Sequence, residues 1–360
     1  MSLQTPTPPK TNPKDAPKKN QWAWSILFVF IAIGTIAAVI LQNKDFSFYD
    51  FSQYIKSASL LWLLAALGCM VLYVLFEGLA LLIICRAFGY KCNLWQGYIY
   101  SSADIYFSAI TPSATGGQPA SAYFMVKDGM SKMMITSALI MNLCMYTLSI
   151  IVVGTLCFVF RFNTFLDYNL ISQLFIIFGY LVQVGLAIFF IFLFFNKSLL
   201  HKLCSSFLHI LCKIKILRKE EQKQTRLNNA MERYHHYVTV LSGHRKTLLF
   251  VLLFNLLQRF FHICITVFAF LATGGTIKQA IDVWFMQGYV LIGSYCVPIP
   301  GGMGVSDSLL LDSFDSIMSN EAAVHLDLLS RSLSFYLCIL LCGISILLQY
   351  CVVKKRGDIV

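Results

Sequence analysis

The sequence predicts an all-α polytopic membrane protein with about six full spans and two re-entrant helical hairpins in an inverted-repeat arrangement. Hydrophobic residues make up 58% of the 360-residue chain and charged residues only 12%, whereas a soluble domain carries about 25% charged residues. Several uncharged apolar runs reach the roughly 20 residues that a helix needs to cross a bilayer. Two Pro- and Gly-rich motifs interrupt apolar segments, one in each half of the chain, which is the pattern of paired broken helices.

The N-terminal part is predicted to hold a polar tail and two spans. Residues 1–21 are rich in Pro, Thr, Lys and Asn, a composition that predicts a disordered tail. Residues 22–41 are uncharged, and no small-residue cleavage site follows them, so we expect an anchored first span rather than a removed signal peptide. The second span runs from Leu60 to Cys85 and contains Glu77.

A first hairpin and two further spans follow. Residues 94–127 are moderately apolar and contain the run TPSATGGQP at 111–119. Because Pro and Gly break helices, we expect this segment to enter the membrane and return on the same side. The uncharged runs 133–160 and 169–195 are long enough to cross the membrane.

The segment 196–247 is strongly basic, with eleven Lys and Arg residues against three Glu residues. Apolar residues at helical spacing between 199 and 214 predict an amphipathic helix on an anionic membrane surface, and the rest predicts a polar cytoplasmic helix or loop. A basic chain can also bind nucleic acid, but here the basic residues flank apolar spans and do not interleave with aromatic residues. We therefore predict no nucleic-acid partner.

The last third repeats the pattern of span, hairpin and span. Residues 248–273 form a predicted span that carries Arg259 and His262. Residues 280–318 contain PIPGGMGVSD at 298–307 and are predicted to form the second hairpin. A final uncharged span covers 332–353, and the basic tail 354–360 follows it.

The distribution of basic residues predicts the orientation, because cytoplasmic loops carry the excess of Lys and Arg. With the N-terminus in the cytoplasm and both hairpins re-entrant, the segments 196–247 and 354–360 both fall in the cytoplasm. A full crossing in place of either hairpin, or of both, would move one of these basic segments outside. The hairpins then enter from opposite faces, and the halves 60–195 and 248–353 form an inverted repeat. We expect a multi-pass protein of a bacterial-type cell membrane with both termini cytoplasmic.

The two broken motifs are predicted to meet near the membrane midplane and to build a polar pocket. Irregular backbone at membrane depth is tolerated where it is buried in protein or lines a wet cavity. The free amides of broken helix ends suit an anion such as a lipid phosphate. The alternative is that both motifs are ordinary interfacial loops between complete spans.

Ionisable residues inside apolar segments are costly and mark functional sites by default. Those residues are Glu77, Asp104, Arg259, His262, Asp282, Asp307 and Arg331. An Arg can bind phosphate bidentately, and a carboxylate can bind an Arg or a cationic headgroup. We expect helix-end snorkelling for Asp282, either role for Arg86, and a structural contact for His262. The spacing of Cys, His and carboxylate residues predicts no metal site, no catalytic triad and no cofactor.

Three segments together resemble the transmembrane domain of the lysylphosphatidylglycerol synthase/flippase family. They are EGLALLIICR at 77–86, TPSATGGQPASAYFMVKDGMS at 111–131 and VPIPGGMGVSD at 297–307. The resemblance covers about residues 22–353 as a stand-alone membrane part. It implies a flippase-like domain that moves a phospholipid, aminoacyl-phospholipid or glycolipid between leaflets.

The resemblance assigns a lipid-headgroup cavity to the motif positions. These are Thr111, Pro112, Gly116, Gly117, Gln118, Pro298, Pro300, Gly301, Gly302, Gly304 and Asp307, with Arg86 and Arg331 at basic positions of the family. The intramembrane residues Glu77 and Arg259 complete the candidate site. Gln118 and Asp307 stand where Glu is common in the family, which leaves the cargo open.

The bifunctional relatives carry a soluble aminoacyl-transferase domain after the membrane part, and this sequence reaches Val360 without one. The polar segment 196–247 is too short to fold as such a domain, so we expect a translocator. The alternatives are a phosphatidylglycerol lysyltransferase that uses lysyl-tRNA, a membrane subunit of a lipid-modifying enzyme, and a non-transporting scaffold. The expected partners are membrane phospholipids, anionic or aminoacylated, a separate lipid-modifying enzyme, and further copies of the chain.

Overall fold

The structure is a computed structural model that describes most of the chain after residue 47. The described residues are 48–111, 114–196, 198–199, 201–203, 205–206, 209, 220–297, 299–302 and 304–357. The predicted tail and first span, and most of the predicted amphipathic helix, lie outside these ranges. Within them, every regular element is helical.

Five helical segments among the described residues are long and apolar enough to cross a membrane. They are α3 (Leu60–Ala87), α6 (Lys132–Phe160), α8 (Leu170–Phe195), α11 (Arg245–Ala272) and the last helical run from Asn320. These confirm the predicted apolar spans at 60–85, 133–160, 169–195, 248–273 and 332–353. The chain is therefore a multi-span helical membrane protein.

The last helix begins earlier than the uncharged run that predicted it. It consists of α14 (Asn320–Arg331), a π-helical segment η3 (Ser332–Leu337) and α15 (Cys338–Gly357). Its first part carries Asp327 and Arg331, which a search for uncharged runs leaves out. Both side chains are buried, and the helix tolerates them because they lie beside charged partners of the same network.

Two pairs of short helices stand where the hairpins were predicted. The first pair is α4 (Leu94–Ile110) with α5 (Gly117–Lys127), and the second is α12 (Ala280–Ser294) with α13 (Val305–Phe314). The longest of them has 17 residues, about 25 Å of helix, which is short of the roughly 30 Å hydrocarbon core. Within each pair the two helices pack against each other.

Each pair returns to the end from which it started. The Tyr90 hydroxyl, just before α4, donates a hydrogen bond to the backbone oxygen of Asp128, just after α5. At the second pair, the Phe314 ring at the end of α13 lies 6.2 Å from the ring of Phe270, which precedes α12. Both pairs are therefore helical hairpins.

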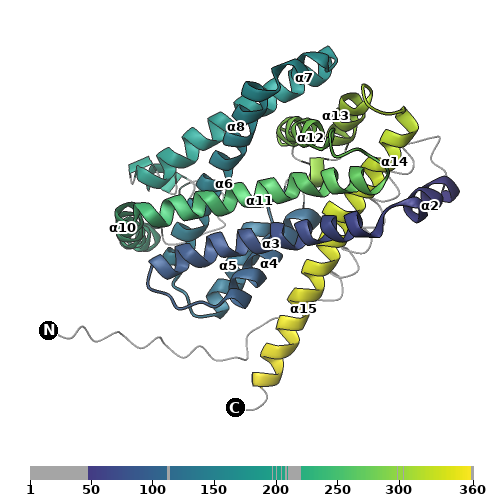
Figure 1. The fold of residues 1–360 in the computed structure, drawn as a ribbon. Helices are drawn as coiled ribbons and strands as arrows, with labels where there is room; N and C mark the ends of the chain where they lie inside the picture. Colours follow the sequence, from purple (N-terminus) through teal and green to yellow (C-terminus); the bar gives the residue numbers. More distant parts are fainter. Residues whose placement is uncertain are drawn as a thin grey trace. The chain divides into compact units, whose positions relative to one another are not determined.

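The helices α3 and α11 pack side by side and run in opposite directions (Figure 1). At one end the Ser59 amide donates to the Ala272 backbone oxygen at 2.7 Å. Near the middle, Gln258 of α11 donates to Glu77 of α3. Because each hairpin follows the C-terminus of its own long helix, the two hairpins start from opposite ends of the α3–α11 pair.

The two ends of the helical body differ in charge. The end at which α3 finishes and α11 begins carries the basic residues Arg86, Lys91, Lys127, Lys132, Arg245 and Lys246 against the acidic residue Asp128. The opposite end carries Lys56, Arg161 and Lys278 together with the acidic residues Asp167, Asp282, Asp315 and Glu321. This asymmetry is the one that the positive-inside rule uses to orient a membrane protein.

The remaining described helices lie at the ends of the spans. They are α2 (Phe48–Ser57), α7 (Phe162–Asp167) and α10 (Glu220–Gly243). Helix α10 falls within the predicted basic segment and packs against α6 and α11. Its buried residues Tyr234 and Leu241 join a core cluster with Phe194 and Val251, so this part of the segment is a docked helix.

The first hairpin approaches α3 closely because both helices present glycine at their crossing. A Cβ atom on Gly78 would lie 2.7 Å from the backbone oxygen of Gly97, and a Cβ on Gly97 would lie 2.7 Å from the oxygen of Gly78. The Ser101 hydroxyl, one turn further along α4, donates to the Val74 oxygen at 2.8 Å. Small residues at such crossings allow helix backbones to meet within a membrane.

We predict that Gly78→Ala destabilises the fold by about 1–3 kcal/mol, because the added methyl group must push the two backbones apart. The measurement is unfolding of the purified protein in mixed detergent micelles, followed by circular dichroism. Gly68→Ala on the same helix is the matched control, since nothing lies within 4 Å of a Cβ at Gly68. Equal stability of the two variants would contradict the close crossing.

Candidate functional site

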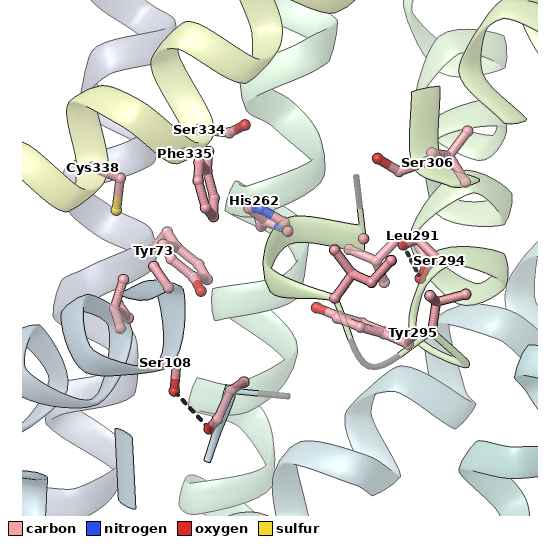
Figure 2. A pocket seen from close by; sticks show the side chains of 18 of the residues that line it. Tyr73, Ser108, His262, Leu291, Ser294, Tyr295, Ser306, Ser334, Phe335 and Cys338 are labelled. Carbon is pink, nitrogen blue, oxygen red and sulfur yellow. Dashed lines mark hydrogen bonds between the residues drawn. The ribbon is translucent and has the colours of Figure 1, made fainter. Parts of the chain in front are cut away.

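A cavity of about 670 Å³ lies between the tips of the two hairpins. The first tip contributes Ala114 and Gln118, and the second contributes Gly301 and Gly302. Figure 2 shows Tyr73 of α3, His262 of α11 and Tyr295 after α12 around this cavity. Helix α8 closes another side with apolar residues, Val182 and Leu186. The hairpins therefore contribute both polar and apolar side chains to the cavity, whereas the α8 side is apolar.

The glycines of the first tip let the start of α5 lie against α4. The Thr111 hydroxyl donates to the Phe107 oxygen at 2.6 Å and accepts from the Gly116 amide at 2.8 Å. A Cβ on Gly116 would lie 2.6 Å from the Thr111 methyl group, and a Cβ on Gly117 would overlap the Asp104 and Ser108 side chains. Both glycines are thus required by close approach, while Pro112 lies outside the described residues.

Gln118 and Asp104 connect the two arms of this hairpin. The Gln118 amide nitrogen donates to Asp104 Oδ2 at 2.6 Å, and the Ser108 hydroxyl donates to Asp104 Oδ1 at 3.2 Å. Both Gln118 and Asp104 line the cavity. The residues that follow Gly116 therefore place the Gln118 amide where it donates a hydrogen bond to the buried Asp104 carboxyl group.

The second tip turns on three glycines in the left-handed region. Gly301, Gly302 and Gly304 have φ angles of +68°, +62° and +85°, a conformation that residues with a Cβ adopt only with strain. Pro300 opens the 3₁₀ turn Pro300–Gly302, and Pro298 lies outside the described residues. The Gly304 amide donates to Asp307 Oδ2 at 2.8 Å, which caps the start of α13.

Arg331 ties this tip to the last helix. It forms an ion pair with Asp307 and donates to the Ser306 hydroxyl at 2.7 Å. Its Nε atom lies 3.9 Å from Asp327 Oδ2. Arg331 is buried and lines the cavity, so one cation lies between two carboxylates at the wall of the cavity.

Glu77 and Asp104 form an acidic group on the other side of the cavity. Their carboxyl groups lie within hydrogen-bonding distance of each other, one on α3 and the other on α4. Gln258 Nε2 of α11 donates to Glu77 Oε2 at 2.8 Å. The two side chains line the cavity and are only 6% and 7% exposed.

Arg259 lies behind three tyrosines of the cavity wall. Its guanidinium group is fully buried and donates to the hydroxyl groups of Tyr146 and Tyr295. It also lies over the Tyr146 and Tyr73 rings, at 4.5 and 5.4 Å from their centres. The Nε and Nη2 atoms have no hydrogen-bond partner. Such unused donors in a buried guanidinium suit an anion.

Five of the fifteen sequence-predicted site residues line this cavity, and others lie at the hairpin tips or behind its wall. Glu77, Gln118, Gly301, Gly302 and Arg331 line it. Thr111, Gly116, Gly117, Gly304 and Asp307 shape the two tips, and Arg259 stands behind the tyrosines.

Two of the predicted charged residues lie elsewhere. The exposed Arg86 donates to the backbone oxygen of Cys92 at 3.1 and 2.9 Å, which closes the turn after α3. Asp282 forms an ion pair with Arg161 at 3.0 Å, and both side chains are 43% exposed. Its exposed position agrees with the helix-end role expected for it.

Sequence reasoning missed the tyrosines and the amide of Gln258. Tyr73, Tyr146 and Tyr295 lie in three apolar segments, where an aromatic residue carries no particular signal. Gln258 stands next to Arg259 in a predicted span, and two adjacent polar residues in an apolar helix could have indicated a functional position. His262 was expected to make a structural contact, and its ring stacks on Tyr73 at 4.8 Å while it also lines the cavity.

A sequence model of the family described as "Lysylphosphatidylglycerol synthase TM region" matches residues 22–342 of the chain. The matched part contains α3, α6, α8, α11 and both hairpins, and it ends inside α15. A comparison with curated proteins finds no match.

We predict that Arg331→Leu destabilises the protein by about 3–5 kcal/mol, because Asp307 and Asp327 then lose their buried cation. Unfolding in mixed micelles measures the loss. Adding Asp307→Leu to Arg331→Leu should restore part of the stability, since it removes one of the orphaned charges.

The matched control is Arg161→Leu, which breaks an ion pair of half-exposed side chains and should cost about 0–1 kcal/mol. A loss at Arg331 no larger than that at Arg161 would contradict the buried network.

Proposed function

Because the chain belongs to the lysylphosphatidylglycerol synthase TM-region family, we propose that it translocates a phospholipid, an aminoacyl-phospholipid or a glycolipid between the leaflets of a cell membrane. The observation that carries the proposal is the cavity, lined by both charged and apolar side chains, between the tips of two hairpins that start from opposite ends of the α3–α11 pair. A lipid headgroup needs such a polar path through the hydrocarbon core. Paired broken helices at a shared cavity occur in inverted-repeat transporters, which supports the proposal.

In the proposed arrangement the α3–α11 pair crosses the bilayer, and the hairpins are re-entrant from opposite faces. The basic end, with Arg86, Lys132 and Arg245, faces the cytoplasm. Both termini are then cytoplasmic, with 22–41 as a sixth span. The tips lie near the midplane, where irregular backbone needs protein or water around it.

The headgroup phosphate is proposed to bind near Arg259, and the acyl chains stay in lipid. Arg259 has two donor nitrogens, Nε and Nη2, without partners behind the tyrosine side chains, and a phosphate offers the matching acceptors. The apolar side of the cavity at Val182 and Leu186 belongs to α8, a helix whose apolar side chains are mostly exposed in the chain by itself. Lipid chains can therefore lie along α8 while the headgroup is enclosed.

The family description also names a synthase, which favours a membrane subunit of a lipid-modifying enzyme as the second candidate. Membranes that contain this chain alone, supplied with lysyl-tRNA and phosphatidylglycerol, separate the two candidates. Formation of lysylphosphatidylglycerol would favour the enzyme, and its absence together with lipid movement would favour the translocator.

We predict that Arg259→Met slows lipid movement about ten- to a hundredfold, because a hydrogen bond to a charged group contributes roughly 1.5–3 kcal/mol. Vesicles of phosphatidylglycerol and phosphatidylethanolamine contain acyl-labelled fluorescent phosphatidylglycerol, and dithionite bleaches the outer leaflet. The fold should survive the change, since Tyr146 and Tyr295 retain the hydrogen bond between their hydroxyls at 3.3 Å.

Arg161→Met serves as the control, since Arg161 is half-exposed and distant from the cavity wall. Equal movement by the Arg259 and Arg161 variants would refute a headgroup role for Arg259. Wild-type vesicles that bleach like protein-free vesicles, whatever labelled lipid is used, would refute translocation.

We further predict that Lys132→Cys is labelled from the cytoplasmic side and Lys278→Cys from the outside, because the two positions lie at opposite ends of the helical body. The reagent is a membrane-impermeant maleimide, applied to intact cells and to inverted vesicles. A Cys351→Ser parent measures background labelling, since Cys351 is the exposed free cysteine of the described residues. Labelling of both positions from one side would contradict the proposed topology.

A further inference from the structure

The contact between Glu77 and Asp104 joins the first hairpin to the long helix α3. Glu77 lies on α3, Asp104 on α4, and the two carboxyl groups are within hydrogen-bonding distance. Both residues are more than nine-tenths buried and both line the cavity. Two negative charges in contact in a low-dielectric interior repel each other strongly.

The neighbouring groups do not supply a counter-charge by direct contact. Gln258, Gln118 and Ser108 donate hydrogen bonds to the two carboxyl groups, and all three are neutral. No Lys or Arg side chain in the described ranges forms an ion pair with Glu77 or Asp104. Arg259 on α11 acts on Glu77 only at longer range and directs its bonded N–H group to tyrosine hydroxyls.

Other titratable groups near the pair come from several helices. Tyr73 on α3, Tyr146 on α6, and Cys338 and Cys342 at the start of α15 interact with Glu77, while His262 on α11 and Tyr295 after α12 line the same cavity. None of these brings a permanent positive charge to the carboxyl groups.

An independent sign of a missing ligand is the Gln258 side chain. Its amide nitrogen binds Glu77, so its carbonyl oxygen Oε1 lies at the edge of the same group. That oxygen is fully buried and has no partner. A buried acceptor without a donor costs about 1–3 kcal/mol. The two carboxyl groups and the unpartnered Gln258 oxygen are all acceptors, and a hydrogen-bond donor or a small cation would stabilise them.

We propose that Glu77 and Asp104 bind one exchangeable proton between them, and that this proton couples the first hairpin to the transmembrane proton gradient. With the proton bound, the two carboxyl groups share it and α4 stays against α3. When the proton leaves, the two carboxylates repel and the tip that carries Gln118 moves away from α3. The proposal rests on the proposed function for its coupling to lipid, but the proton site itself does not.

Infrared spectroscopy tests the proton site without any transport. The purified protein is placed in nanodiscs of phosphatidylglycerol, and the carbonyl stretch of a protonated carboxylic acid is recorded near neutral pH in sodium-free potassium buffer. The wild-type spectrum should contain a band that Glu77→Gln and Asp104→Asn each remove completely. Asp282→Asn, at the exposed ion pair, is the matched control and should leave the band unchanged.

A band that persists in both Glu77→Gln and Asp104→Asn would overturn the proposal. So would a band that disappears when sodium is added, because the ligand would then be a metal cation. These outcomes are independent of whether the protein moves lipid.

Vesicles with a pH difference test the coupling. The membrane potential is clamped with valinomycin and potassium, and the leaflet distribution of fluorescent phosphatidylglycerol is read by dithionite bleaching. One proton per lipid should produce up to about a tenfold leaflet asymmetry for each pH unit. Glu77→Gln should abolish the asymmetry, and Asp282→Asn should retain it.

A pH-independent, even distribution with the wild-type protein would overturn the coupling. Absence of any lipid movement would instead refute the proposed function, and the infrared band would then decide the proton site alone.

Discussion

The constraint on which this structure depends is that charged and polar groups within a membrane-spanning body must find their partners inside the protein. Arg331 satisfies it through ion pairs with Asp307 and Asp327 and a hydrogen bond to Ser306, while its Nε atom donates no hydrogen bond. Glu77 and Asp104 satisfy it in part, through two amides and a hydroxyl. Arg259 leaves two donors unused. The Arg331 network therefore fixes the second hairpin, whereas Glu77, Asp104 and Arg259 keep interactions available for a ligand.

The glycines make this arrangement possible by bringing backbones together. Gly78 and Gly97 set the first hairpin against α3, and Gly117 leaves room for Asp104 at the tip. Without these contacts Asp104 could not reach Glu77, because the two residues belong to separate helices. The cavity is therefore a consequence of backbone geometry. The charged groups that line it, such as Glu77 and Asp104, are close together because the glycines bring their helices together.

Much of the fold follows from local pattern. Apolar runs predicted α3, α6, α8, α11 and the last helix, and Pro with paired Gly predicted both helical hairpins. The same reasoning placed Glu77, Gln118, Gly301, Gly302 and Arg331 near one cavity. It missed the tyrosine wall around Arg259 and the amide of Gln258, because those contacts join residues that are far apart in the sequence, such as Tyr146 and Arg259 or Glu77 and Gln258. It also began the last helix too late, since Asp327 and Arg331 look polar until their partners are known.

The central claim is that the cavity between the two hairpin tips holds a lipid headgroup. The most direct measurement is an electron cryo-microscopy map of the protein in phosphatidylglycerol nanodiscs, at a resolution that shows side chains. The account predicts headgroup density between the tips, within hydrogen-bonding distance of Arg259 Nε or Nη2, with acyl-chain density leading out along α8. A cavity collapsed to apolar side-chain packing, with both tips lying at the membrane surface, would contradict it.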